Sequence, residues 1–310
     1  MLNSTYRVIS IVGPTASGKS ALAEEIACRL NTEVVSADAM QVYRGMDIGT
    51  AKTPLSQRKV PLRCVDLVDP DQAYSVALYA QDSHNAIDEL VQSNSMAVLC
   101  GGTGLYVRAG LENMEFPAGE QTNNPVREKY EAMAQELGPD GFHALLHQRD
   151  PQSAALIHPN NVRRVVRAFE LLEQGTSYAK EHQTLHVRID RFPTLHIGLS
   201  MSRERLYARI NERVDQMVEQ GLVNEVQGLL DRGLGETLTA RQAIGYKEII
   251  DYLNGTRSLQ DAVEEIKRST RRYAKRQFTW FKADERINWL DLDTMSFDES
   301  VKTVMSMLEA

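Results

Sequence analysis

The sequence predicts an α/β fold in which a parallel sheet is flanked by helices, with a helical segment inserted into it. Three observations lead to this prediction. Short apolar, β-branched runs alternate with helical periods over the first hundred residues. A glycine-rich stretch that fits a phosphate-binding loop follows the first of these runs. From residue 112 to residue 191, the pattern changes to helices with few strand candidates.

Four apolar runs are the expected strands of the first hundred residues: RVISIV, TEVVSA, CVDLV and MAVLCGG. Helical periodicity predicts helices from Gly18 to about Leu30 and from about Ser75 to Gln92. Further along, TLHIGLSM (194–201) is expected to return to the sheet as a buried strand, and INWL (287–290) is expected to form a late strand. In such folds ligands bind at the carboxyl ends of the strands, so the phosphate-binding loop is expected at that edge.

These patterns divide the chain into two parts. Residues 1–111 and 192–310 are expected to form the α/β core, whose second half is mostly helical, and residues 112–191 a helical insertion. Within the insertion, VREKYEAMAQELG and NVRRVVRAFELLEQG read as helices joined by turns that contain Pro and Gly.

The composition is that of an ordinary globular protein. Of 310 residues, 42% are hydrophobic and 25% are charged, so disorder is not expected. The first residues lack a basic stretch followed by a long apolar run, and no segment approaches the roughly 18 uninterrupted apolar residues of a membrane span. We therefore expect a cytoplasmic protein with no membrane partner. The net charge of -7 argues against a generic nucleic-acid coat, although it leaves room for a local basic face.

The three cysteines, Cys28, Cys64 and Cys100, stand singly inside apolar segments. They form no C-x-x-C pair, so neither a zinc site nor a disulfide framework is indicated. We expect them to be buried, reduced thiols.

GPTASGKS, residues 13–20, fits the phosphate-binding pattern G-x-x-x-x-G-K-[ST] between a predicted strand and a predicted helix. Backbone N–H groups and the Lys19 ammonium would face a diphosphate or triphosphate there, and the Ser20 hydroxyl is the usual ligand of a Mg2+ ion on the phosphates. The expected diphosphate-binding residues of the loop are Gly13, Pro14, Thr15, Ala16, Ser17, Gly18, Lys19 and Ser20. The pattern alone does not identify the rest of the ligand.

Two further polar residues follow predicted strands at the same edge of the sheet. Asp38 comes just after TEVVSA and is a candidate base for a substrate proton or an indirect Mg2+ ligand; a helix cap or strand-end turn is the alternative. Thr103 lies in GGTG, whose glycines would let the backbone approach a ligand. Asp47 is a weaker candidate, because D-I-G is a good turn by itself.

Residues 267–282 form a concentrated basic segment in this acidic chain. They include seven Lys and Arg side chains and no Asp or Glu. Arg268, Arg272 and Arg276 recur at helical spacing and would share one face. Cations without acidic partners on one face suit a phosphate backbone, whereas the aromatic residues of the segment are expected mainly in the core.

Two smaller basic clusters favour the same kind of partner. Arg163, Arg164 and Arg167 would share a helix face in the insertion, and Arg241 with Lys247 frames the segment RQAIGYK. Basic clusters on separate elements can surround one extended polyanion, for which RNA is the natural candidate.

Six segments, in this order along the chain, resemble the bacterial tRNA dimethylallyltransferases, also called tRNA isopentenyltransferases or IPP transferases: GPTASGKS, SADAMQVYRGMDIGTAK, GGTGLYV, NVRRVVRAFEL, QAIGYKE and AKRQFTWF. The resemblance covers almost the whole chain, and DIGTAK and KRQFTWF are more specific than the phosphate loop. It implies a P-loop-type sheet and an enzyme that transfers a dimethylallyl group from dimethylallyl diphosphate to tRNA. The acceptor would be the exocyclic N6 amine of the adenine 3′-adjacent to the anticodon, giving N6-isopentenyladenosine and diphosphate.

The resemblance also implies roles for individual residues. Lys19, Mg2+ on Ser20 and Arg213 would stabilise the departing diphosphate, and Asp38 would orient the amine and accept its proton. The insertion would help to clamp the anticodon stem-loop, and a monomer is expected. The tRNA-binding residues that the resemblance implies are Asp38, Ala39, Met40, Gln41, Thr103, Arg127, Arg163, Arg164, Arg167, Arg241, Gly245, Tyr246, Lys247, Lys275, Arg276, Gln277 and Lys282.

Other functions remain as alternatives. A small-molecule or nucleotide kinase would explain the phosphate loop and Asp38 but not the basic segment at 267–282. An adenylate isopentenyltransferase would use the same donor on a free nucleotide and would have little need of several basic clusters. A non-enzymatic RNA-binding module would use the clusters and leave the loop unexplained.

Overall fold

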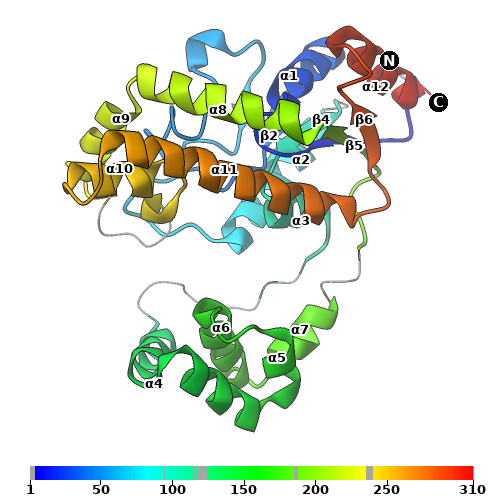
Figure 1. The fold of residues 1–310 in the computed structure, drawn as a ribbon. Coiled ribbons are helices and arrows are strands. Elements are labelled where there is room, and N and C mark those ends of the chain that lie inside the picture. Colours follow the sequence, from blue (N-terminus) through cyan, green and yellow to red (C-terminus); the bar gives the residue numbers. More distant parts are fainter. Residues whose placement is uncertain are drawn as a thin grey trace. The chain divides into compact units, whose positions relative to one another are not determined.

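The computed structural model describes residues 4–93, 95–114, 116, 124–184, 188–234 and 240–309. Its contacts divide the chain into two compact units (Figure 1). The first unit comprises Met1–Asn113 and Asp190–Ala310, and the second comprises Met114–Ile189. Each unit has a hydrophobic core of its own.

The first unit is built on a six-stranded parallel sheet with the strand order β3-β2-β4-β1-β5-β6. The sheet confirms the predicted α/β fold. Its strands are β1 (Val8–Val12), β2 (Val34–Ser36), β3 (Leu62–Arg63), β4 (Ala97–Gly101), β5 (Thr194–Ser200) and β6 (Asn288–Asp291). Every residue of β1 is buried, because this strand lies inside the sheet and both of its faces are covered.

The predicted strand at CVDLV, residues 64–68, is wrong. The strand of this region is β3, which ends just before it at Arg63. Cys64 and Asp66 have φ values of 58° and 55°, which lie in the left-handed region and interrupt an extended chain. The sequence pattern gave no sign of these two conformations, because apolar spacing reports burial and not backbone dihedral angles.

Helices cover both faces of the sheet (Figure 1). On one face, α1 (Lys19–Leu30) packs on β1 and β4 and against α12 (Phe297–Glu309). On the other face, α2 (Val76–Gln92) and α3 (Gly104–Leu111) pack together near Leu99. The other elements of this unit are the 3-10 turns η1 (Leu55–Gln57) and η3 (Ala240–Gln242) and the helices α8 (Arg203–Glu219), α9 (Leu222–Leu230), α10 (Tyr246–Leu253) and α11 (Leu259–Lys282). Helix α11 contacts α8, α10 and α3.

The second unit contains helices only, in the part of it that the structure describes. They are α4 (Pro125–Arg149), α5 (Pro151–Leu156), α6 (Val162–Glu173) and α7 (Tyr178–Thr184). Helices α4 and α6 correspond to those expected from VREKYEAMAQELG and NVRRVVRAFELLEQG. Its core is aromatic: the Phe169 ring lies 4.5 Å from Tyr130 and 5.0 Å from Phe142, measured between ring centroids. Helix α4 is interrupted at Gly138, whose φ is 67° and which precedes Pro139.

The cysteine prediction holds for two residues of three. Cys64 and Cys100 are buried, whereas Cys28, near the end of α1, is exposed. Among the described residues, no three His, Cys, Asp or Glu side chains are grouped so that they could share a metal ion. Nor does any described helix combine the length and the apolar composition that a membrane span requires.

The ends of β2 and β4 approach each other closely. The Ala37 N–H donates to the Cys100 carbonyl at 2.8 Å, and the Thr103 N–H donates to the Ala37 carbonyl at 3.2 Å. A Cβ atom on Gly101 would lie only 2.2 Å from the Ala37 carbonyl oxygen. Gly101 is therefore required by contact between two segments of the protein, and the interpretation that this glycine makes room for a ligand is wrong.

We expect Gly101→Ala to lower the urea concentration at the midpoint of unfolding, with a loss of roughly 1–3 kcal/mol, because the backbone of Ala37 cannot rotate away from the added methyl group. Gly228→Ala is the matched control: an added Cβ has no neighbour within 4 Å there. Because Gly228 lies inside α9, alanine should be neutral or stabilising by up to ~1 kcal/mol. Equal midpoints for the two variants would show that the contact at Ala37 is not tight.

Candidate active site

The phosphate-binding loop connects β1 to α1 at the carboxyl edge of the sheet. Gly18 has a φ of 95°, a left-handed conformation that favours glycine, and α1 begins at the next residue, Lys19. The first N–H groups of a helix have no partner within it, so they are available to an anion. The structure thus places GPTASGKS between a strand and a helix, as the pattern predicts.

Two cations and one carboxylate meet at this loop. The Lys19 ammonium donates to the Pro14 carbonyl at 3.3 Å. Burial lowers the pKa of Lys19; among nearby charged groups, Arg213 acts in the same direction and Asp38 in the opposite one. Burial also lowers the pKa of Arg213, and Asp38 again opposes the effect. The excess positive charge would be neutralised by a diphosphate in the loop.

Asp38 stands just after β2 and is half-buried. One of its carboxylate oxygens, Oδ1, accepts the Met40 N–H at 2.9 Å, so Asp38 forms the strand-end turn considered as the alternative. The neighbouring Ala39 N–H donates to the Thr103 hydroxyl at 3.1 Å. The structure therefore brings Asp38 and Thr103 together, and it places Asp38 within electrostatic reach of Lys19.

Gln277 of α11 joins two loops of the site. Its Oε1 accepts the Thr15 N–H at 2.8 Å, and its Nε2 donates to the Gly102 carbonyl at 2.9 Å. The side chain is buried. Contact between Gln277 and RNA would require these bonds to break, so in this structure Gln277 holds the phosphate loop against GGTG.

Two other side chains that hold these loops were not predicted from the sequence. The Arg209 Nε donates to the Ala16 carbonyl at 2.8 Å, which anchors the phosphate loop to α8. The Tyr273 hydroxyl of α11 lies close to the side chains of Thr103 and Gln277. Tyr273 and Gln277 are four residues apart on a helix and so share its inward face. A polar residue within that otherwise apolar stripe is a signal that could have identified Gln277.

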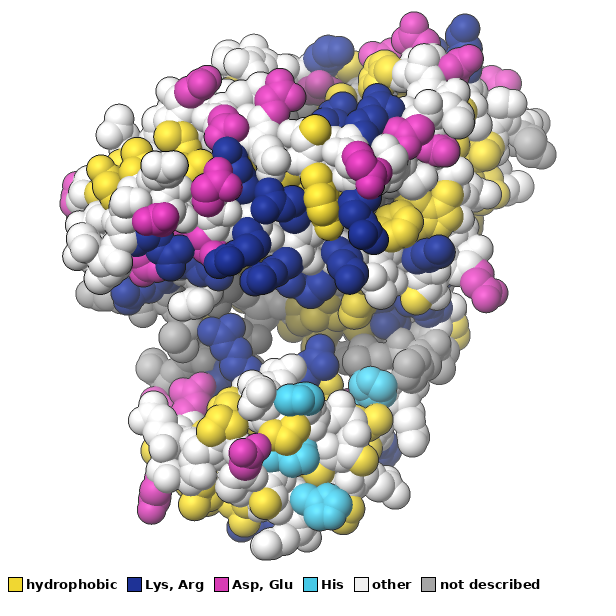
Figure 2. Space-filling model, in the orientation of Figure 1, with side chains coloured by type: hydrophobic (Ala, Val, Ile, Leu, Met, Phe, Trp, Pro, Cys, Tyr) yellow, Lys and Arg dark blue, Asp and Glu magenta, His cyan; other side chains and the backbone are white. Residues whose placement is uncertain are grey.

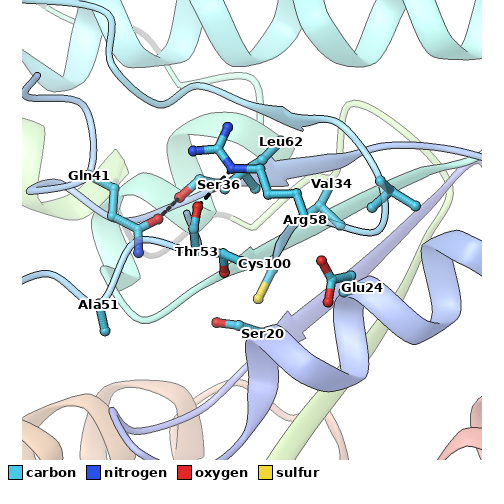
Figure 3. A pocket seen from close by; sticks show the side chains of 11 residues that line it. Ser20, Glu24, Val34, Ser36, Gln41, Ala51, Thr53, Arg58, Leu62 and Cys100 are labelled. Carbon is cyan, nitrogen blue, oxygen red and sulfur yellow. Dashed lines mark hydrogen bonds between the residues drawn. The ribbon is translucent and has the colours of Figure 1, made fainter. Parts of the chain in front are cut away.

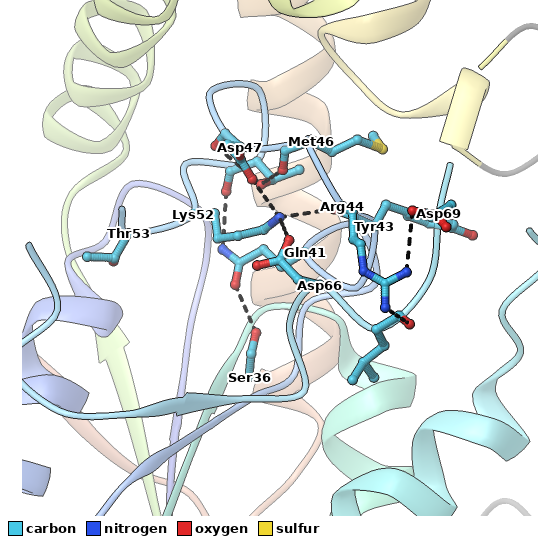
Figure 4. Close-up of polar contacts among 12 residues, drawn as sticks. Ser36, Gln41, Tyr43, Arg44, Met46, Asp47, Lys52, Thr53, Asp66 and Asp69 are labelled. Atoms are coloured by element: carbon cyan, nitrogen blue, oxygen red, sulfur yellow. Dashed lines mark hydrogen bonds and ion pairs between the residues drawn. The ribbon is translucent and has the colours of Figure 1, made fainter. Parts of the chain in front are cut away.

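The segment after Asp38 is held by polar contacts, some of which are made by the buried Lys52 side chain (Figure 4). The Lys52 ammonium donates to Asp47 at 2.7 Å, to Asp66 at 2.6 Å and to the Tyr43 carbonyl at 3.0 Å. The Gln41 amide accepts from the Ser36 hydroxyl at 2.9 Å and donates to the Thr50 carbonyl at 3.3 Å. The Lys52 N–H also closes a turn on the Asp47 carbonyl, which agrees with the turn expected at D-I-G.

Glu225 of α9 binds the D-I-G turn through its backbone. Its carboxylate accepts the N–H groups of Asp47, Ile48 and Gly49 at 3.0, 2.7 and 3.1 Å. It also accepts the Tyr246 hydroxyl at 2.7 Å. Sequence reasoning missed Glu225, because the turn that it binds lies more than 170 residues earlier in the chain.

The predicted tRNA contact at Tyr246 is not supported by its surroundings. Tyr246 is fully buried, and a Cβ on Gly49 would lie 2.4 Å from its ring. The neighbouring Gly245 N–H donates to the Glu248 carboxylate at 2.8 Å, which caps α10. Tyr246 and Gly245 therefore act in this structure as supports, while Arg241 is exposed and Lys247 lies 3.5 Å from Glu248.

Lys and Arg side chains gather over α11 (Figure 2). The expectation that this segment lacks acidic partners is wrong for its first two cations: Lys267 pairs with Asp215 and Glu264, and Arg268 pairs with Glu265. The remaining exposed cations make no ion pair with any residue that the structure describes, and we call them the α11 basic surface: Arg272, Lys275, Arg276 and Lys282. Trp280, which is 42% exposed, lies in the same segment.

The predicted cations of the second unit differ in their partners. Arg127 and Arg167 both pair with Glu170, at 3.5 and 3.1 Å, and the Glu170 side chain is 3% exposed. Arg163 and Arg164 are exposed, and neither forms an ion pair within the described residues. Two cations thus hold a buried carboxylate, and two are available to a polyanion.

We expect Glu225→Gln to loosen the D-I-G turn, because an amide offers one acceptor oxygen where the carboxylate uses two, and its NH2 group faces backbone donors. Amide hydrogen exchange at Asp47, Ile48 and Gly49 should accelerate at least tenfold, which is ~1.4 kcal/mol of local opening free energy. Glu219→Gln, an exposed change on α8, is the control and should leave these rates unchanged. Unchanged exchange in Glu225→Gln would show that the turn holds without Glu225.

Comparison with known sequences gives close relatives. The family model described as IPP transferase matches residues 41–284. The tRNA dimethylallyltransferase of Acetivibrio thermocellus is 44% identical over 301 residues, which cover 95% of this chain and 94% of that protein. The tRNA dimethylallyltransferase of Bacillus subtilis is 42% identical over 294 residues, with coverage of 94% and 93%.

Solved structures agree with this result. A tRNA isopentenylpyrophosphate transferase from Staphylococcus epidermidis is 39% identical, covers 97% of both chains and has a TM-score of 0.71. A eukaryotic dimethylallyltransferase acting on tRNA is 28% identical, with a TM-score of 0.78, over 97% of this chain and 79% of that one. The chain belongs to the IPP transferase family.

Proposed function

We propose that the protein transfers a dimethylallyl group from dimethylallyl diphosphate to the N6 amine of the adenine 3′-adjacent to the anticodon of a tRNA. The products are N6-isopentenyladenosine and diphosphate. The observation that supports this proposal best is the meeting of Lys19 and Arg213 with Asp38 at the phosphate loop, beside helix α11, which bears the α11 basic surface. The activities for which the relatives are named agree with it.

The loop would stabilise the leaving group. As the bond between the allylic carbon C1 and the diphosphate oxygen breaks, negative charge grows on the diphosphate. The backbone N–H groups at the start of α1, the Lys19 ammonium and the Arg213 guanidinium would stabilise that charge; the two cations interact electrostatically with each other beside the loop. Donors and cations fixed in advance at the site of developing charge lower the barrier.

The residues at the loop fit a Mg2+ ion that takes most of its ligands from water and diphosphate oxygens. Ser20, at the end of the pattern, is exposed and offers a hydroxyl, and no three described carboxylates, thiols or imidazoles form an all-protein cage. When bound, Mg2+ neutralises part of the diphosphate charge. Ser20 is the residue that we propose as its protein ligand.

Asp38 would act on the acceptor. The N6 amine attacks C1, the new carbon–nitrogen bond replaces the carbon–oxygen bond, and the proton lost from nitrogen passes to the Asp38 carboxylate. Because Met40 already occupies Oδ1, the second oxygen is the one available to the amine. Fixing the amine by a hydrogen bond before attack also reduces the entropy cost of the reaction.

The exposed cations would bind the RNA backbone. The α11 basic surface, Arg163 and Arg164, and Arg241 offer positive charge on separate elements. A base in an anticodon loop is reached by splaying it out of its stack, which needs phosphate contacts on either side of it. We propose that the second unit contributes by clamping the anticodon stem-loop and that one chain suffices for one tRNA.

Kinase activity is the alternative from another enzyme class. It would use the phosphate loop and Asp38 but would not require the α11 basic surface. Adenylate isopentenyltransferase activity would use the same donor with a free nucleotide as acceptor.

One assay separates these functions. The protein is incubated with Mg2+, labelled dimethylallyl diphosphate and an unmodified tRNA whose anticodon is followed by adenine, and then with AMP in place of the tRNA. We expect label in the tRNA and none in AMP. Label in AMP alone, or phosphoryl transfer from ATP with no prenyl transfer, would contradict the proposal.

Asp38→Asn should lower kcat at least 100-fold, because the amide keeps the shape of the side chain but cannot accept the proton. Binding of tRNA, measured by filter retention, should change by less than threefold. If kcat stays within tenfold of the parent, a difference of only ~1.4 kcal/mol, Asp38 is not the base.

Neutralising two cations of the α11 basic surface, in Arg272→Gln with Arg276→Gln, should weaken tRNA binding and reduce the slope of log Kd against log salt. Removing one cation that binds a phosphate changes that slope by roughly 0.7–0.9. Lys267→Gln with Arg268→Gln removes the same charge from the same helix but from cations that pair with acids, and it should leave the slope nearly unchanged. Equal slopes for the two double variants would show that Arg272 and Arg276 do not bind phosphate.

A further inference from the structure

A cluster of charged side chains lies where the chain passes between the two units. The chain leaves the first unit after Asn113 and returns to it at Asp190. Glu112 directly follows α3, Asp190 lies shortly before β5, and Arg286, just before β6, contacts both carboxylates. None of these three residues lines the pocket that opens beside Ser20 at the candidate site (Figure 3), so the cluster is a separate feature.

The backbones of the two connections are paired at this point, which we call the junction. Glu112 and Asp190 form an isolated antiparallel bridge, and the Arg191 N–H donates to the Leu111 carbonyl at 2.6 Å. Even a complete two-stranded hairpin is only marginally stable in water, and this pairing is shorter. Side chains must therefore hold the junction together.

Arg286 supplies the main side-chain link across the junction. Its Nη1 donates to the Asp190 carboxylate at 2.8 Å, and its Nη2 donates to the Glu112 carboxylate at 2.9 Å. Asp284 accepts from the Arg286 Nε at 2.9 Å and from Nη2 at 2.7 Å. Because the N–H donors of a planar guanidinium have fixed directions, these contacts hold the two connections in one geometry.

Both bridged carboxylates are also anchored to the core of the first unit. The second oxygen of Glu112 accepts the Arg108 Nε at 2.7 Å, and both side chains are buried. The second oxygen of Asp190 lies 3.0 Å from the His196 ring, whose other nitrogen lies 2.9 Å from the buried Ser10 hydroxyl. The network therefore ties the junction to α3, β1 and β5.

A buried ionic network of this kind is weak evidence of a contribution to stability. The cost of removing charged groups from water offsets most of their mutual attraction, and the better-attested use of such networks is to specify one arrangement. Here the arrangement that is specified is the pairing of the two connections.

We propose that Arg286 is a positioning residue for tRNA binding, which restricts the motion of the second unit by holding Glu112 and Asp190 together. The inference rests on the proposed function, since it takes tRNA as a ligand that both units bind. When two linked units bind one ligand, the stiffness of the link sets the effective concentration of the second unit at the ligand. A fixed junction also reduces the freedom that is lost on binding.

Removing the bridge should weaken tRNA binding and spare the phosphate loop. Arg286→Gln should raise the Kd for an unmodified tRNA at least fivefold, measured by filter retention. The Kd for inorganic diphosphate with Mg2+, measured by calorimetry, should stay within threefold of the parent. Arg63→Gln is the matched control and should change neither Kd, because Arg63 also bridges two acids of the first unit, Glu33 and Glu89.

A second variant separates positioning from direct contact between Arg286 and RNA. Asp190→Ala removes the bridge, keeps the Arg286 cation and also removes a negative charge. It should weaken tRNA binding at least fivefold, as Arg286→Gln does, although the two variants change the charge in opposite directions. A cation that binds a phosphate directly would give equal or tighter binding in Asp190→Ala. Glu89→Ala, which removes a negative charge beside Arg63, is the control.

Hydrogen exchange in the free protein measures the junction without RNA. The Arg191 N–H, which donates to the Leu111 carbonyl, should exchange at least tenfold faster in Arg286→Gln and in Asp190→Ala than in the parent. The two controls should leave this rate unchanged. Unchanged exchange in Arg286→Gln would overturn the inference, because Arg286 would then not hold the junction.

The inference is also overturned if Arg286→Gln and Asp190→Ala keep the Kd for tRNA within threefold, or if they weaken inorganic diphosphate as much as tRNA. Equal or tighter tRNA binding in Asp190→Ala alone would assign Arg286 a direct contact instead. Failure of the proposed function gives a different result: the parent then transfers no label to an unmodified tRNA, while exchange at Arg191 still responds to Arg286→Gln.

Discussion

The two hydrogen bonds of Gln277 are the contact on which the candidate site depends. A phosphate-binding loop needs its N–H groups fixed before an anion arrives, and GGTG needs a fixed position if Thr103 is to hold the residue after Asp38. One buried amide does both, because it accepts from Thr15 and donates to Gly102. Breaking either hydrogen bond would leave a buried polar group without a partner, which costs free energy. The two loops therefore keep one arrangement.

Helix α11 therefore has two roles, and its helical periodicity places them on different faces. Tyr273 and Gln277 point inward to the loops of the candidate site, while Arg272, Lys275 and Arg276 point outward as part of the α11 basic surface. Arg276 nevertheless lies 5.6 Å from the Tyr273 ring centroid, so the two sets of side chains are adjacent. RNA bound to the outer face would contact the same helix whose inner face fixes the phosphate loop.

The sequence was sufficient for features that depend on neighbouring residues. The strand, loop and helix around GPTASGKS, the position of Asp38 after β2 and the turn at D-I-G all follow local rules of spacing and conformation. It was insufficient where the partner is distant in the chain. Lys267 looked unpaired for two reasons: Asp215 lies on another helix, and Glu264, three residues earlier on α11, falls just outside the segment 267–282. Glu225 gave no signal because the N–H groups that it accepts belong to residues 47–49. The pattern of apolar residues also gave no indication of the left-handed backbone conformations of Cys64 and Asp66.

The phosphate loop alone cannot decide which bond of its ligand breaks. In phosphoryl transfer the loop binds a donor whose terminal phosphorus is attacked, whereas in prenyl transfer both phosphates leave together and the attacked atom is carbon. Groups outside the loop must therefore determine whether phosphoryl or prenyl transfer occurs. The Asp38 carboxylate, which interacts electrostatically with Lys19 and Arg213 at the loop, is one such group. The loop supplies the common anchor for a diphosphate, and the groups around it decide which reaction follows.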